Sequence, residues 1–128
     1  VYNPADHAHV LTRRARGVPF WFSLAVHGTD AYRDAIEQTL SVARATRDLV
    51  VAAEHLELLV EPELTVVAFR RRGWGADDYQ AWCDRLMADG TAMLTPTTFE
   101  GSPAMRVCII NPRTTLDDLV EIFATLEP

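Results

Sequence analysis

The stretch AMRVCIINPRTT, residues 104–115, contains in order a candidate strand, a turn and the cap of a helix. Alternate side chains of an extended chain point to opposite faces, and here both faces are largely apolar. The pattern therefore predicts a strand with neither side made for water, and it places a guanidinium where apolar surface is expected. One face carries Met105, Val107 and Ile109, and the other carries Arg106, Cys108 and Ile110.

A buried guanidinium without a partner is costly, so Arg106 is expected to meet an anion. One candidate partner is an internal acid such as Glu100 or Asp118, which would make a structural ion pair. The other is a carboxylate ligand, because the planar fork of arginine matches a carboxylate in bidentate geometry. The residues alone favour the ion pair and leave the ligand open.

Upstream of this stretch, the sequence predicts two helices and a hairpin. Residues 19–27, PFWFSLAVH, form an almost wholly apolar helix with proline in its first turn, and Gly28 can end it. A long amphipathic helix follows from Thr29, which suits the N-cap position. Residues 56–60 and 64–70 resemble strands separated by a proline-containing turn, which predicts a hairpin.

Two further helices are predicted in the second half of the chain. Residues 76–90 place apolar side chains at helical spacing, with two aspartates at the start and a glycine at the end. The last helix begins near Leu116, and Thr114 or Thr115 can cap it. Both helices also carry acidic residues in the first turn, where the helix dipole favours them.

Short strands are expected at residues 92–95 and 104–111, separated by a loop at residues 96–103. The resulting order is helix, long helix, two strands, helix, two strands, helix. This order predicts the α+β class, with a small antiparallel sheet of three to four strands and helices packed on one of its faces.

Composition limits the function classes. The chain has 128 residues with 48% hydrophobic and 23% charged residues, which fits a single domain over residues 1–128 with residues 1–12 as an extended tail. A net charge of −6 argues against nucleic acid, and no apolar run suits a membrane span. Two distant cysteines and no signal-peptide pattern predict a cytoplasmic setting. The absence of an initial methionine favours a piece of a longer protein.

Few residues suggest chemistry. Asp6, His7 and His9 are close together, but they lie in the predicted tail and need a further ligand, so no metal site is predicted. The arginines within residues 13–16 and 70–72 are interpreted as solvated edges rather than phosphate sites. All 12 basic residues are arginine, so the chain cannot perform Schiff-base chemistry unaided.

Three segments stand together in an order and spacing that are fairly specific. They contain a double arginine before a tryptophan-containing helix, a strand ending in Phe-Arg, and an arginine strand leading through Asn-Pro to a threonine-capped helix. The segments are TRRARGVPFWFSLAVHGTDAYRDAIE (12–37), LELLVEPELTVVAFR (56–70) and MRVCIINPRTTLDDL (105–119). The chain thereby resembles the C-terminal part of the group II pyridoxal-phosphate-dependent amino-acid decarboxylases, the family of the aromatic-L-amino-acid, glutamate and histidine decarboxylases.

This resemblance implies the small C-terminal domain of a fold-type I enzyme, which closes over pyridoxal 5'-phosphate held by a large domain. It implies a lyase of amino-acid metabolism that works as a homodimer on an amino-acid substrate. The Schiff-base lysine and the other catalytic and cofactor-binding residues would belong to the missing upstream part, so this chain would be inactive alone.

The resemblance also implies a role for Arg106. The residue matches the small-domain arginine that faces the active site and meets a substrate carboxylate, either the α-carboxylate or a distal one. With the resemblance, this role is favoured over the internal ion pair. The alternatives are a free-standing domain whose Arg106 binds a carboxylate ligand, and an interaction domain that docks through the helix containing Trp21.

Overall fold

The structure, a computed structural model, describes residues 14–126. The predicted tail, with Asp6, His7 and His9, lies outside the described residues. The chain divides into two compact units, the first ending at Asp34 and the second beginning at Ala35.

The first unit contains the predicted apolar helix and its end. Helix α1, Gly17–Ala52, has non-helical backbone at Gly28, with φ 77° and ψ 166°. Glycine tolerates a positive φ without a steric penalty, so the prediction that the helix ends at Gly28 is confirmed. Contacts form across this break: the rings of Phe20 and Tyr32 meet edge-on at 6.0 Å, and the Tyr32 hydroxyl donates a hydrogen bond to Ser23.

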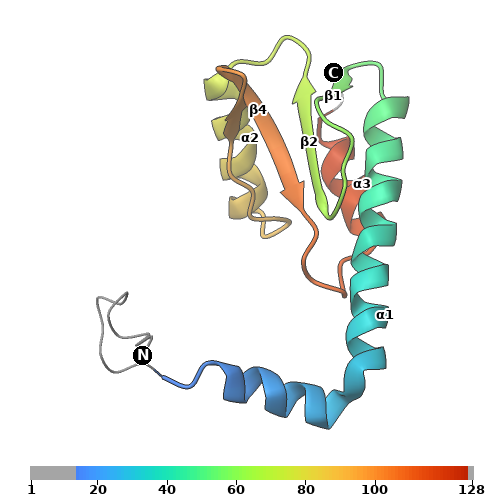
Figure 1. The fold of residues 1–128 in the computed structure, drawn as a ribbon. Helices are drawn as coiled ribbons and strands as arrows, with labels where there is room; N and C mark the ends of the chain where they lie inside the picture. Colours follow the sequence, from blue (N-terminus) through green and yellow to red (C-terminus); the bar gives the residue numbers. More distant parts are fainter. Residues whose placement is uncertain (1–13, 127–128) are drawn as a thin grey trace, which may run out of the picture. The chain divides into compact units, whose positions relative to one another are not determined.

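The second unit is built on a four-stranded antiparallel sheet in the order β1-β2-β4-β3 (Figure 1). The strands are β1 (Leu56–Leu58), β2 (Val66–Arg71), β3 (Thr97–Phe99) and β4 (Ser102–Cys108). Strands β1 and β2 pair as the predicted hairpin, and β4 pairs with both β2 and β3. The predicted α+β class with a small antiparallel sheet is confirmed.

The position of the third strand differs from the prediction. Residues 92–95 form no strand, and β3 lies within the segment that was predicted to be a loop. The cause is the turn between β3 and β4, where Glu100 and Gly101 have φ of 50° and 76°. Two consecutive positive φ values make the tight turn that hairpins favour, so the residues just before it pair with β4. Ala92 and Leu94 instead pack against the core.

Helix α2 (Ala76–Ala88) begins at the predicted residue, and α3 (Leu116–Ala124) begins after the predicted cap Thr115. At the start of α3, the Thr115 hydroxyl accepts a hydrogen bond from the Asp118 N–H at 3.2 Å. The Asp118 carboxylate in turn accepts one from the Thr115 N–H at 2.8 Å. These reciprocal bonds satisfy two main-chain donors that a helix start otherwise leaves unpaired.

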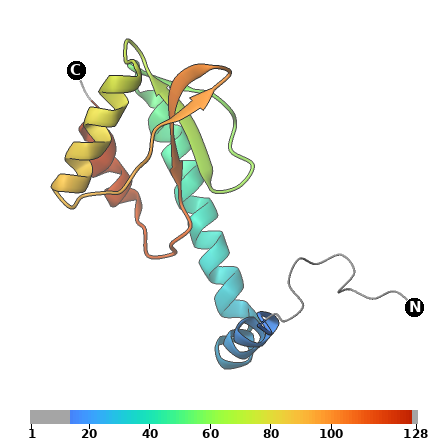
Figure 2. The same ribbon diagram turned by 90° about the vertical axis from the view of Figure 1, so that its left-hand side faces the viewer.

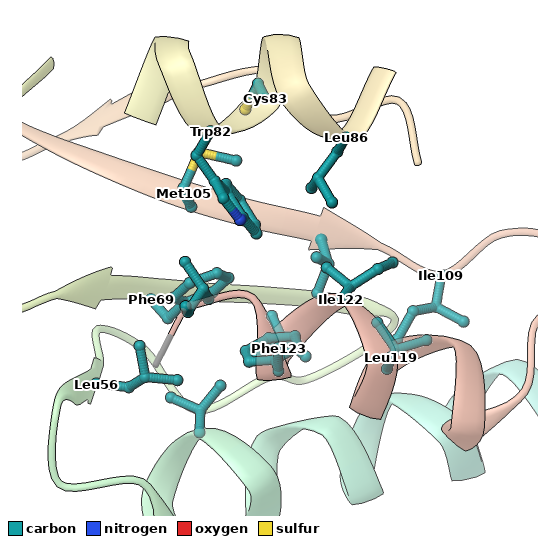
Figure 3. Packing of buried hydrophobic residues seen from close by; sticks show 14 of the residues in the cluster. Leu56, Phe69, Trp82, Cys83, Leu86, Met105, Ile109, Leu119, Ile122 and Phe123 are labelled. Atoms are coloured by element: carbon teal, nitrogen blue, oxygen red, sulfur yellow. The ribbon is translucent and has the colours of Figure 1, made fainter. Parts of the chain in front are cut away.

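The core lies between one face of the sheet and the helices. Figures 1 and 2 show α2 and α3 on the same side of the sheet, and α1 contributes buried residues from Thr39 onward. Figure 3 shows side chains of α2 and α3 pointing toward β2 and β4. The rings of Phe69 and Phe123 lie 5.0 Å apart, and the Trp82 indole N–H donates to the Thr125 hydroxyl at 2.7 Å. The prediction of helices on one face of the sheet is confirmed.

Candidate functional site

The second face of the sheet is not covered by α2 or α3 (Figure 2). We call it the open face. The strand register places Ala68 beside Arg106, Val66 beside Cys108 and Glu57 beside Arg70. The side chains of the open face include Glu57 from β1, Val66, Ala68 and Arg70 from β2, and Arg106 and Cys108 from β4.

Arg106 is exposed in the middle of this face. The predicted alternation of β4 is confirmed, since Met105, Val107 and Ile109 are all buried on the core side. The expectation that Arg106 is buried is wrong, because no helix of the second unit covers the face on which it lies. The position is therefore accessible to a partner from outside this unit.

The predicted internal ion pair of Arg106 does not form among residues 14–126. Glu100 lies in the turn between β3 and β4, and the Asp118 carboxylate is bonded to the main chain at the start of α3. That main-chain bond and the Thr115 hydroxyl hold the pKa of Asp118 below its usual value. Within the described residues, the guanidinium of Arg106 remains available for an external anion.

Arg70, the other arginine of the open face, is engaged within the domain. Its Nε donates to the Pro103 carbonyl at 3.1 Å, and one of its terminal nitrogens donates to the Phe99 carbonyl at 3.4 Å. A second terminal nitrogen lies 4.0 Å from the Glu57 carboxylate. These bonds place its side chain along the sheet from β2 across β4 to the end of β3, and the side chain is 27% exposed.

The run of three arginines at residues 70–72 is more than a solvated edge. Besides Arg70, Arg71 donates from Nε to the Leu126 carbonyl at 2.8 Å, and Arg72 donates to the Glu54 carbonyl at 3.2 Å. Arg72 is exposed as predicted, whereas Arg70 and Arg71 are half-buried. Consecutive arginines thus bind the β3–β4 hairpin, the end of α3 and the region after α1.

The two cysteines occupy opposite sides of the sheet. Cys83 of α2 is buried in the core, and burial raises the pKa of its thiol, with a smaller contribution from Asp84. Cys108 is exposed on the open face, although the sequence predicts that neither side of this strand faces water. The reason is the same as for Arg106, since the two residues share a face.

The described residues do not complete an active site by themselves. Residues 14–126 contain no group of three or more histidine, cysteine or acidic side chains arranged to hold a metal ion. The sequence contains no lysine, so the chain cannot supply the amine that joins pyridoxal phosphate in a Schiff base. In the part of the chain described, no helix is long and apolar enough to cross a lipid bilayer.

Relatives of this chain are amino-acid decarboxylases. It is 28% identical over 124 residues to the aromatic-L-amino-acid decarboxylase of Bacillus atrophaeus, covering 91% of this chain and 26% of that protein. It is 31% identical over 111 residues to the histidine decarboxylase of Drosophila melanogaster, covering 87% of this chain and 13% of that protein. The L-2,4-diaminobutyrate decarboxylase of Acinetobacter baumannii is 28% identical over 119 residues, covering 88% and 23% of the two chains.

Solved structures give the same fold. The glutamate decarboxylase domain of diaminobutyrate-pyruvate transaminase and L-2,4-diaminobutyrate decarboxylase from Vibrio parahaemolyticus matches with a TM-score of 0.76 at 25% identity, covering 92% of this chain and 26% of that one. The Oryza sativa TDC with PLP and tryptamine matches with a TM-score of 0.81 at 21% identity, covering 97% of this chain and 28% of that one. No family model matches the chain.

These comparisons confirm the resemblance found in the sequence. The homologues of this chain are decarboxylases of the pyridoxal-phosphate-dependent group II family. The chain corresponds to a segment of such enzymes, since it spans between 13% and 26% of the length of the three relatives described above.

Proposed function

We propose that this chain is the small C-terminal domain of a pyridoxal-phosphate-dependent amino-acid decarboxylase, a carboxy-lyase, and that it is inactive alone. The relatives support the reaction class, and the short share of their length that the chain spans supports its being one part of a larger enzyme. The absence of lysine agrees with a division of labour in which the cofactor-binding residues lie elsewhere. We further propose that the intact enzyme is a cytoplasmic homodimer, as the resemblance implies.

The observation that carries the proposal is the open face with Arg106 at its centre. In the intact enzyme this face turns toward the cofactor, and the guanidinium binds a carboxylate of the amino-acid substrate. A carboxylate is the matching ligand because the guanidinium offers two parallel donors. Covering the face with the large domain removes water, which strengthens this ion pair relative to the same pair in solution.

The contribution of Arg106 to catalysis is orientation. A pair that binds the substrate carboxylate equally in ground and transition states lowers KM without raising kcat. Fixing the substrate in one position raises the rate, because the bond to be broken is then held in the reactive geometry. Pyridoxal phosphate, held by the large domain, would supply the sink for the electrons left by departing CO2.

The apolar helix before Gly28 supplies a second contact with the rest of the enzyme. Its side chains are strongly exposed for their type, with Trp21 at 66% and Phe22 at 62%. Exposed apolar patches of this kind mark interaction surfaces in soluble proteins. We propose that the occupant is the large domain of the same polypeptide, because the relatives are several times longer than this chain.

The proposal is tested by assaying CO2 release from the intact polypeptide that contains this chain, with and without added pyridoxal phosphate. The substrates are L-phenylalanine, L-tyrosine, L-tryptophan, L-histidine, L-glutamate and L-2,4-diaminobutyrate. We expect cofactor-dependent release from at least one of them and none from the chain alone. If the intact polypeptide releases no CO2 from any of them, while the chain alone binds carboxylates, the free-standing binding domain is the better account.

A further inference from the structure

The pairing of β2 with β4 ends just before the residues that Arg70 binds. Their register runs from Val66 with Cys108 to Phe69 with Met105, and no residue pair follows in the direction of Arg70. Pro103 lies two residues before Met105, and proline cannot donate a main-chain hydrogen bond to a ladder. The side chain of Arg70 reaches across at this point and donates to the Pro103 carbonyl at 3.1 Å.

The same side chain also holds the neighbouring hairpin turn. It donates to the carbonyl of Phe99, the last residue of β3, at 3.4 Å. The next two residues, Glu100 and Gly101, form the turn with positive φ that leads into β4. Arg70 therefore fastens the β3–β4 hairpin to β2 from the open face.

From these contacts we propose that Arg70 is a positioning residue for Arg106, an inference that rests on the function proposed above. Arg106 lies three residues after Pro103 on the same strand, opposite Ala68, so it is the diagonal neighbour of Arg70 on one face. Fastening the start of β4 limits the tilt of the strand that carries the substrate-binding guanidinium. The effect of Arg70 on the substrate passes through Arg106, and Arg70 itself does not touch the substrate.

Charge adds a second reason. Glu57 is the acidic side chain of the open face, and it stands directly opposite Arg70 in the β1–β2 pairing. Its carboxylate lies 4.0 Å from an Arg70 nitrogen. Because Glu57 interacts with Arg70, Arg106 is left available for the carboxylate of a substrate rather than for this internal acid.

The test is a double-mutant cycle in the intact enzyme, using whichever of the six amino acids named above is decarboxylated fastest. Arg70→Gln is made in the native background and in the Arg106→Gln background, because coupled residues give non-additive effects. We expect Arg70→Gln to lower kcat/KM about tenfold in the native background and less than twofold when Arg106 is already replaced. A loss of the same size in both backgrounds, or no loss in either, overturns the inference.

A matched control and a milder variant keep the result interpretable. Arg72→Gln removes an arginine that also binds a main-chain carbonyl, that of Glu54, but lies away from β4; it should change kcat/KM less than twofold. Arg70→Lys keeps the charge but loses the second donor arm, so it should give an intermediate loss that again requires Arg106. If Arg70→Gln does not fold, Arg70→Lys alone decides the coupling.

The cycle also separates this inference from the proposed function. If Arg106→Gln by itself leaves kcat/KM unchanged, the substrate role of Arg106 fails and the inference fails with it. If Arg106→Gln lowers kcat/KM but Arg70→Gln acts equally in both backgrounds, only the positioning role of Arg70 is lost.

Discussion

The two faces of the sheet differ in whether helices cover them. On the core face, Val67 and Phe69 of β2 lie beside Val107 and Met105 of β4, and all four are buried beneath helices. One residue further along each strand, the open face presents Ala68 and Arg106 without a helix above them. The contrast shows that, within residues 35–126, helices cover one face of the sheet only. Under the function proposed above, the other face meets the large domain of the same polypeptide.

The largest difference between the faces is expected in stability. Phe69 is fully buried against Phe123, so Phe69→Ala should lower the free energy of unfolding by about 3–5 kcal/mol, through lost burial and the cavity left behind. The open-face control Val66→Ala, on the same strand but 44% exposed, should cost less than about 1 kcal/mol. Urea unfolding of the two variants measures both effects. Equal losses of unfolding free energy would show that the two faces contribute equally to stability.

A smaller effect is expected at the start of α3, one of the helices that cover the core face. Thr115→Ala removes the hydroxyl that accepts the Asp118 N–H and should lower the free energy of unfolding by about 1 kcal/mol. Thr115→Ser keeps an acceptor at the same place and is the matched control. Thermal unfolding at pH 7 measures the loss, and a variant as stable as the native chain would show that this cap contributes nothing.

The same cap predicts a pH dependence. The pKa of Asp118 is lowered in the folded chain, first by the Thr115 N–H and then by its hydroxyl, so the folded state binds this proton more weakly than the unfolded state. The resulting stability is present above the ordinary aspartate pKa of about 3.9 and is lost as the pH falls through the lower folded value. Asp118→Asn should therefore reduce the fall of the unfolding free energy with decreasing pH below about pH 4. If the unfolding free energy falls equally in the native chain and in Asp118→Asn below this pH, Asp118 is not the group responsible.

The smallest perturbation is chemical labelling of the thiols, which leaves the fold intact. Cys108 on the open face should react rapidly with a water-soluble disulfide reagent, whereas Cys83 should react only on unfolding, because it is buried and its pKa is raised. Cys108→Ser identifies the fast thiol. In the intact enzyme the proposed large domain covers the open face, so we expect slow labelling of Cys108 there. Fast labelling of Cys108 in the intact enzyme would count against this cover.

Features set by local sequence could be predicted, and features set by distant residues could not. The apolar spacing of α2, the Thr115 cap and the break at Gly28 each depend on neighbours within a few residues. The alternation of β4 was predicted for the same reason. The exposure of Arg106 was missed, because alternation says nothing of what covers each face.

The roles of Arg70 and Arg71 were missed for a related reason. Their acceptors are main-chain carbonyls, which every residue carries, so no side-chain pattern marks them. One of these bonds joins residues 55 positions apart. The strand β3 was predicted at the wrong residues. The two-residue turn at Glu100 and Gly101 determines which residues pair with β4, and the alternation of side chains before the turn does not.

The proposal that the open face brings Arg106 to the substrate is tested by the kcat/KM of Arg106→Gln in the intact enzyme. The matched control is Arg85→Gln, which removes an exposed arginine on α2 in the layer behind the sheet. We predict that Arg106→Gln loses about 2–4 kcal/mol of transition-state stabilisation with the cofactor absorbance unchanged, while Arg85→Gln behaves as the native enzyme. Equal kcat/KM values for the two variants would rule out a substrate role for Arg106.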